Sequence, residues 1–183
     1  MKIIIFTSSP NKDGLTAACG KAAEQGAIEG GAEVVCINLN AVAVGRCDAC
    51  GNAWGTCRNS HACQVQDDFQ QIHKDIADSD AYVLITPVYW GEMSESAKSF
   101  FDRLRRCEAL RKEESLMYGK LAVAVAAAGG SGNGTISSLE SMERLLKHMG
   151  ANIFDLISVT QKSRSYKIDT IRACTRAIAQ KGQ

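Results

Sequence analysis

Short apolar runs alternate with segments of helical periodicity, and this alternation limits the folds open to the chain more than any other feature. The runs are rich in β-branched residues, whereas apolar residues between them recur every three or four positions. Runs that are apolar almost throughout need cover on both faces, so the pattern predicts a parallel sheet between two helical layers. The predicted strands cover 3–6, 34–39, 82–86, 121–126 and 153–159, and the predicted helices lie around 15–23, 69–76, 97–104, 136–146 and 168–178.

Right-handed crossovers turn these strands and helices into a doubly wound α/β sandwich of three layers. Polar residues at Asn152, Asp155 and Ser158 favour an edge position for the last strand, and hence the strand order 2-1-3-4-5. Pro87 is expected to end the third strand. With 183 residues, 45% of them apolar, we expect a single domain over 1–183, with an irregular cysteine-rich loop at about 40–66.

The charge balance and the apolar runs exclude two classes of partner. Lys and Arg number 21 and Asp and Glu 20, so the net charge of +1 gives no reason to expect nucleic acid or an anionic membrane surface. No apolar run reaches spanning length, and the N-terminal run is too short for a signal peptide. We therefore expect a cytoplasmic protein, in which eight cysteines favour metal, cluster or redox roles over a disulfide framework.

Ligands of such sheets lie beyond the carboxyl ends of the strands, so the loops after the first, third and fourth strands are the candidate site. The first loop, TSSPNKDGLT, is rich in hydroxyls and leads into a helix N-terminus. Free backbone N–H groups, the helix dipole and donors at Ser9, Asn11 and Thr16 suit a phosphate monoester. An ordinary helix cap is the alternative. The segment from Gly14 to Lys21 does not match a Walker motif, and the glycine run at 129–134 does not match the dinucleotide fingerprint.

The other two loops suit a flat aromatic ligand. Tyr89 and Trp90 follow the third strand as an aromatic platform, and Gly91 lets backbone N–H groups approach ring heteroatoms. Core packing or a dimer surface would explain the same aromatics. Gly129 and Gly130 after the fourth strand could pass beneath the ring plane, with a flexible turn as the alternative. Together the three loops favour a flavin mononucleotide.

Three segments carry a resemblance to a known family: SSPNKDGLT after the first strand, CQVQDDF before the second helix, and TPVYWGEMSESAKSFFDR from the third strand onward. With a C-x-x-C after the second strand, they resemble the NADPH-dependent FMN reductase family of flavodoxin-like proteins, especially the branch that includes the iron-sulfur flavoproteins. The resemblance implies a flavodoxin-like three-layer sandwich with FMN as cofactor and NAD(P)H as electron donor. It also implies a homodimer or a homotetramer.

The resemblance implies two groups of FMN-binding residues in this chain. Around the phosphate and ribityl chain lie Ser8, Ser9, Asn11 and Thr16, and around the isoalloxazine lie Pro87, Val88, Tyr89, Trp90, Gly91, Gly129 and Gly130. The first loop departs from the family pattern, because Ser8, Asn11 and Leu15 replace a glycine, an arginine and an asparagine. The loss of a guanidinium and an amide removes two phosphate donors, so we expect weaker FMN binding than usual or a remodelled loop.

The function that the resemblance implies is NAD(P)H-dependent reduction of FMN or of a quinone-like acceptor. Because the cofactor performs the hydride chemistry, we expect no catalytic side chain. Two alternatives stay open: an iron-sulfur flavoprotein that relays electrons from ferredoxin, and a non-enzymatic carrier of flavodoxin type, against which the near-neutral charge argues. The partner is then a small-molecule or redox-protein electron acceptor.

The segment CDACGNAWGTCRNSHAC places Cys47, Cys50, Cys57 and Cys63 in one loop with the spacing C-x2-C-x6-C-x5-C. Four thiolates are the number that a 4Fe-4S cluster needs. Iron-sulfur flavoproteins resemble this loop in position but begin C-x2-C-x2-C, whereas here Ala53 occupies the third site and Cys57 would have to reach in. Free or packing cysteines, structural zinc and a redox disulfide are the alternatives.

Charged residues near this loop have simpler interpretations. Arg103, Arg105 and Arg106 are expected to form the solvated end of the third helix, with binding of a dinucleotide phosphate or of a subunit partner as the alternative. Asp67 is expected to cap the second helix together with Gln70 in a capping box. Buried positions on helices and strands are expected for Cys19, Cys36 and Cys174.

Overall fold

The computed structural model describes residues 1–181. The strands are β1 (Lys2–Thr7), β2 (Glu33–Asn38), β3 (Ala81–Tyr89), β4 (Glu92–Met93), β5 (Leu121–Ala128) and β6 (Asn152–Thr160). The α-helices are α1 (Leu15–Glu29), α2 (Phe69–Ala77), α3 (Glu95–Glu108), α4 (Thr135–His148) and α5 (Arg164–Lys181). Two 3₁₀ segments, η1 (Thr56–Arg58) and η2 (Ala109–Glu114), lie in the connections.

The five long strands form a parallel sheet in the order β2-β1-β3-β5-β6. This order confirms the predicted doubly wound α/β fold. The strand β4, which the sequence did not predict, has two residues and pairs antiparallel with the end of β3. Because β4 is counted, the fourth and fifth parallel strands are labelled β5 and β6, and their order in the sheet is the predicted one.

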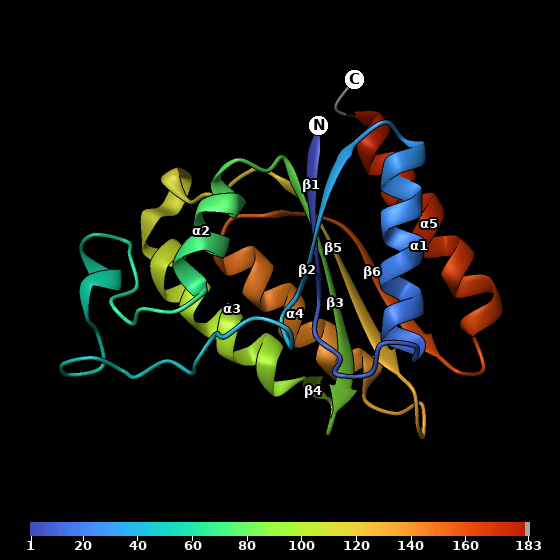
Figure 1. Ribbon diagram of the computed structural model, residues 1–183, viewed down its shortest axis with the longest axis horizontal. Helices are drawn as coiled ribbons and strands as arrows, with labels where there is room; N and C mark the ends of the chain where they lie inside the picture. The colour runs from blue at the N-terminus through green and yellow to red at the C-terminus, as the bar shows by residue number, and fades with distance from the viewer. Residues whose placement is uncertain (182–183) are drawn as a thin grey trace.

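Helices cover both faces of the sheet (Figure 1). α1 and α5 pack together on one face, and α2, α3 and α4 lie on the other. Alternate residues of β1 face opposite sides of the sheet. Ile3 and Ile5 belong to the core under α1 and α5, while Ile4 and Phe6 belong to the core on the other face. Each buried side chain of this size stabilises the fold by about 1.5–3 kcal/mol. The apolar runs are therefore continuous because both of their faces are buried.

The third strand is longer than predicted, because Pro87 does not end it. β3 pairs with β1 only as far as Ile85, but Thr86 and Pro87 still pair with β5. Proline lacks the backbone N–H that would donate to a neighbouring strand. Pro87 is tolerated here because the β1 ladder has already ended. The strand therefore carries Tyr89 well beyond the sheet, where β4 returns against it.

The two edge strands of the sheet confirm one prediction from the sequence and correct another. β6 is an edge strand, as its polar residues predicted. β2 is the opposite edge, and Cys36 on it is exposed, so the prediction of a buried thiol there is wrong. Only one face of an edge strand has full helical cover. No helix among residues 1–181 combines the length and apolarity needed to cross a membrane.

Candidate functional site

Loops after three neighbouring strands, β1, β3 and β5, meet at the carboxyl edge of the sheet. The first loop is fastened to the start of α3 through Ser8, whose carbonyl accepts hydrogen bonds from Ser94 Oγ at 3.0 Å and Ser96 Oγ at 3.4 Å. The Ser8 hydroxyl is itself buried and donates to Ile85 O at 3.5 Å. Ser8 therefore joins two of the loops, and its side chain is directed into the protein.

The aromatic platform is the tip of a two-residue hairpin between β3 and β4. Tyr89 pairs with Glu92, which leaves Trp90 and Gly91 in the turn with φ angles of 52° and 81°. Such a turn needs two left-handed residues, and a tryptophan takes that conformation at a cost of roughly 1 kcal/mol or more. Trp90 is fully exposed and Tyr89 is 40% exposed. Packing among residues 1–181 therefore does not account for the Trp90 ring and covers that of Tyr89 only in part.

The loop after β5 packs directly on this hairpin. Gly134 has φ +80°, and a Cβ there would lie 2.7 Å from Gly91 Cα. Ser137 Oγ donates to Gly91 O at 3.0 Å, so the start of α4 holds the turn in place. Only glycine allows this approach of two backbones. One hollow between the loops is lined by Val88, Trp90, Gly91, Ser131, Asn133, Gly134 and Ser137.

The N-terminus of α1 lies at the end of the first loop without a cap. Within residues 1–181, no side chain caps it at Gly14, and its first turn holds no acidic residue. The loop is shaped by local bonds instead: Asn11 N–H donates to Ser9 Oγ, and Asp13 N–H donates to Asn11 Oδ1, both at 3.2 Å. Uncapped N–H groups and the positive end of the helix dipole favour an anion at this point.

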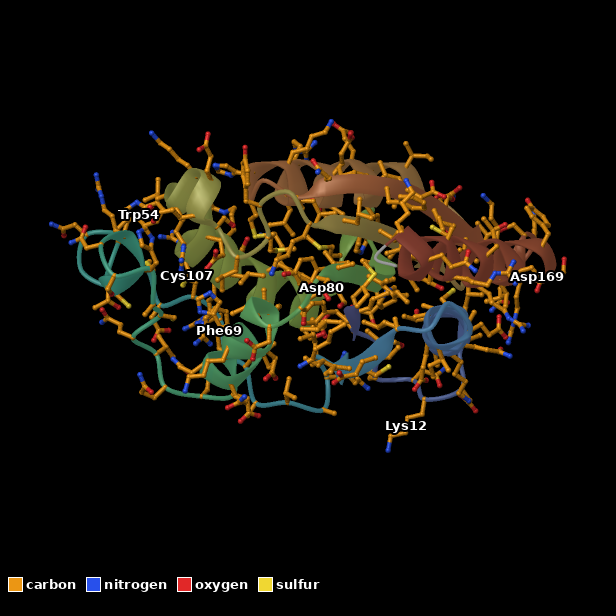
Figure 2. The ribbon with its side chains drawn as sticks, turned by 90° about the horizontal axis from the view of Figure 1, so that it is seen from above. Lys12, Trp54, Phe69, Asp80, Cys107 and Asp169 are labelled. Atoms are coloured by element: carbon orange, nitrogen blue, oxygen red, sulfur yellow. The ribbon has the colours of Figure 1, made fainter. Side chains whose placement is uncertain are left out.

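Lysine side chains add positive charge beside that helix end. Lys12 and Lys21 line one hollow with Ser9, Asn11 and Thr16, which runs along α1 toward Asn38 on β2. Lys12 projects outward from the loop (Figure 2). Position 11 lacks the family's arginine, but a lysine follows it directly. The lysine side chain can supply the cation that the departure at Asn11 had removed.

The space around Gly129 and Gly130 tests whether the residues at this edge fit a flavin mononucleotide. A Cβ on Gly130 would meet no atom within 4 Å, and one on Gly129 would meet only Gln161 Nε2 at 4.0 Å. Neither glycine has a positive φ, so nothing within residues 1–181 requires a glycine at either position. By contrast, a flat ligand above the loop would exclude side chains there.

The structure brings the predicted flavin residues together in two groups. Ser9, Asn11 and Thr16 line the hollow beside α1, and Val88, Trp90 and Gly91 line the hollow beside α4. Pro87 lies within β3, and Ser8 points inward. Five further residues that were not predicted from the sequence also line these hollows: Lys12, Ser131, Asn133, Gly134 and Ser137. The run GGSGNG had signalled the loop of Ser131, Asn133 and Gly134, and Ser137 follows it in α4, but only tertiary contact identifies which residues face the hollow.

A second candidate site is the cysteine loop, which extends beyond α2 and α3 (Figure 1). Its two ends are closed by Arg103, whose guanidinium donates to Asp67 Oδ2 at 2.5 Å and Asp67 Oδ1 at 3.0 Å. The same group donates to Gly45 O at 3.1 Å and to Val65 O at 3.0 Å. Arg103 is buried, so the prediction of a solvated residue is wrong at this position. The partly buried carboxylate partner 36 residues away explains the difference.

This ion pair fixes the ionisation of both partners. Burial alone would raise the pKa of Asp67, but the hydrogen bond from Arg103 and the N–H groups of Gly45 and Phe69 hold it below its ordinary value. Burial would likewise lower the pKa of Arg103, but the hydrogen bond with Asp67 and the neighbouring Cys63 thiol raise it instead. Gln70 Oε1 accepts from Asp67 N–H at 3.1 Å, which confirms the Gln70 half of the predicted capping box.

The four loop cysteines line one cavity together with Arg103 and Arg106. Cys57, which the sequence placed out of register, therefore faces the same space as Cys47, Cys50 and Cys63. No group of three or more His, Cys, Asp or Glu residues within 1–181 converges closely enough to hold a single metal ion. Each thiolate of a 4Fe-4S cluster binds a different iron, so its sulfurs surround a centre rather than meet at one atom. The donor set fits a cluster by its chemistry.

The outer part of the loop is held against α3. Arg106 Nη1 donates to Ala53 O at 2.5 Å, and its guanidinium lies 4.7 Å from the centre of the Trp54 ring. Figure 2 shows Trp54 on this part of the loop, on the same side of the molecule as Cys107. Cys107 lies behind the cavity, where burial raises the pKa of its thiol to about 12 and the neighbouring Cys63 and Cys57 add to the rise.

A flavodoxin-like sheet with an uncapped helix N-terminus and an aromatic hairpin at its carboxyl edge is typical of flavin oxidoreductases. The chain belongs to the NADPH-dependent FMN reductase family, whose model matches residues 1–162.

Similar proteins agree with this membership. An iron-sulfur flavoprotein of Methanosarcina thermophila is 28% identical over 142 residues, which are 78% of this chain and 71% of that protein. One of Archaeoglobus fulgidus is 29% identical over 104 residues, 57% of this chain and 46% of that one. Among solved structures, the NAD(P)H:quinone oxidoreductase of Methanothermobacter marburgensis has a TM-score of 0.67 at 18% identity, covering 97% of this chain and 96% of its own. A Streptococcus pneumoniae flavodoxin has a TM-score of 0.67 at 14% identity, covering 99% of each chain, and both structures show the shared fold.

Proposed function

We propose that the chain binds FMN at the carboxyl edge of the sheet and uses NAD(P)H to reduce FMN or a quinone-like acceptor. One observation carries this proposal: an uncapped helix N-terminus, an exposed aromatic hairpin and an unobstructed glycine loop follow three neighbouring strands of one sheet. Each of the three alone has an ordinary structural explanation. Their occurrence at one sheet edge matches the phosphate, the ring and the ring face of a single ligand.

The first loop would bind the phosphate end of the ligand. Backbone N–H groups of the first turn of α1 would donate to phosphate oxygens, with Ser9, Asn11 and Thr16 beside them. Lys12 would balance the negative charge from the solvent side. Ser8 would act indirectly, because its carbonyl holds the loop against α3.

The other two loops would position the ring. Tyr89 and Trp90 would stack on or flank it, Gly91 would offer backbone N–H groups, and Gly129 and Gly130 would leave room for it. FMN held by these residues would supply the hydride and electron-transfer chemistry. The side chains bind and orient, and we propose no catalytic acid or base among them.

A second candidate function is that of an iron-sulfur flavoprotein. It is favoured by the cavity that all four loop cysteines share, and by the names of the relatives. A 4Fe-4S cluster held by Cys47, Cys50, Cys57 and Cys63 would supply one-electron transfer, with a redox protein such as ferredoxin as the partner.

We also propose a single domain over 1–183 and a homodimer or homotetramer, in which a second chain covers the exposed Trp90 hairpin.

An anaerobic mixing experiment tests the proposed function. The flavin-loaded protein is mixed with NADPH or NADH, and flavin absorbance is followed in a stopped-flow instrument. The reductase proposal expects bleaching within seconds with at least one of the two donors. If the flavin stays oxidised with both but is reduced by ferredoxin, the second candidate replaces the first. Iron, sulfide and zinc analysis of the same sample separates a cluster from zinc and from free thiols.

A further inference from the structure

Arg103 is a buried cation whose hydrogen bonds are almost all accounted for. Four of its N–H groups hold the foot of the cysteine loop through Asp67, Gly45 O and Val65 O. One face of the guanidinium lies 4.5 Å from the centre of the Phe69 ring. The side chain is 1% exposed and is thus fixed in position by its partners.

The fifth N–H of this guanidinium has no partner within residues 1–181. It belongs to Nε, and a buried unpaired donor of this kind costs on the order of 1–3 kcal/mol. Arg103 also lines the cavity of the four cysteines, and its guanidinium interacts with the Cys63 thiol. Arg103 thus keeps one buried, unpaired donor and lines the cavity in which the four cysteines gather.

We propose that Arg103 is a positioning residue for an iron-sulfur cluster in the cysteine loop: it closes the loop with four N–H groups and donates the fifth to a cluster sulfur. The proposal rests on the second candidate function, since it needs a cluster. A cluster with four thiolate ligands is an anion, which a fixed guanidinium stabilises, while the pair of Arg103 with Asp67 is neutral overall. A hydrogen bond to a cluster sulfur favours the reduced form, so it raises the reduction potential.

The test compares Arg103→Lys with wild-type protein after anaerobic reconstitution with ferrous iron and sulfide. Lysine keeps the charge but loses the planar fork and the Nε–H. We expect Arg103→Lys to bind less iron and sulfide per chain and to show a more negative reduction potential in spectroelectrochemical titration. Without iron, Cys57 and Cys63 should react with iodoacetamide about tenfold faster in the variant, as the loss of one charged hydrogen bond predicts. Arg105→Lys is the matched control, because Arg105 lies on the same helix but lines a different hollow.

The outcomes separate the role of Arg103 from its premise. If wild-type protein takes up no iron and sulfide, the proposed cluster is refuted. The proposed role of Arg103 is then refuted with it, while the flavin proposal is unaffected. If wild-type protein binds a cluster and Arg103→Lys matches it in iron content, potential and thiol labelling, the role of Arg103 is refuted while the cluster holds. Should Arg103→Lys not fold, Asp67→Asn replaces it: the guanidinium stays but loses its anchor, and the same changes are expected.

Discussion

Substituting alanine for Gly130 separates the flavin site from the fold. A methyl group at this position would meet no protein atom within 4 Å, and the backbone there is not left-handed. The free energy of unfolding of the flavin-free protein should therefore change by no more than about 0.5 kcal/mol. If the ring lies over this loop, the same methyl group overpacks the complex at a cost of about 1–3 kcal/mol. The dissociation constant for FMN should rise roughly 5- to 150-fold.

Two measurements on one preparation check this prediction. Urea denaturation of the flavin-free variant gives its stability, and quenching of FMN fluorescence gives its affinity. Gly134→Ala is the contrasting variant, because its Cβ would lie 2.7 Å from Gly91 Cα at a positive φ, so it should destabilise the flavin-free protein by about 2 kcal/mol or more. A Gly130→Ala variant that binds FMN as tightly as wild type would show that no ring passes over this loop.

Three further perturbations have expected outcomes. Lys12→Ala should weaken FMN binding about three- to tenfold but leave riboflavin binding unchanged, because only FMN carries the phosphate; equal losses in calorimetric titration would contradict this. Trp90→Gly should stabilise the flavin-free protein to urea by about 1 kcal/mol by relieving a left-handed tryptophan, yet weaken FMN binding; unchanged affinity would place the ring elsewhere. Burial would raise the pKa of Glu108, but His73 Nε2 at 2.6 Å and the N–H of Leu116 lower it, so the carboxylate stabilises the fold above about pH 4.5 and less as the pH falls through its lowered pKa. Glu108→Gln should flatten this acid loss in urea unfolding between pH 3 and 6, and parallel curves would refute it.

The sheet was predictable because its signal is local. β1, β3 and β5 are buried on both faces, so their runs are apolar residue by residue. β4 has two residues and exists only because the hairpin turns at Trp90 and Gly91, which no periodicity can reveal. Pro87 predicted a strand end, since the sequence does not show that the neighbouring ladder has already stopped.

The candidate sites were predictable in place but not in detail. The three loops follow from the strand order, yet Ser8 points into the fold and Lys12 supplies the charge, and both depend on how the first loop turns. Arg103 looked like part of a solvated helix end because its partner Asp67 lies 36 residues away. A charged residue on the apolar face of a helix can be recognised as buried only when its oppositely charged partner elsewhere in the chain is known.

One titration tests the central claim, that the three loops form an FMN site. Flavin-free protein is titrated with FMN and, separately, with riboflavin in an isothermal titration calorimeter. We predict one FMN per chain, bound more tightly than riboflavin because the α1 N-terminus and Lys12 recognise the phosphate. Equal binding of the two compounds, or no binding of FMN, would contradict the account.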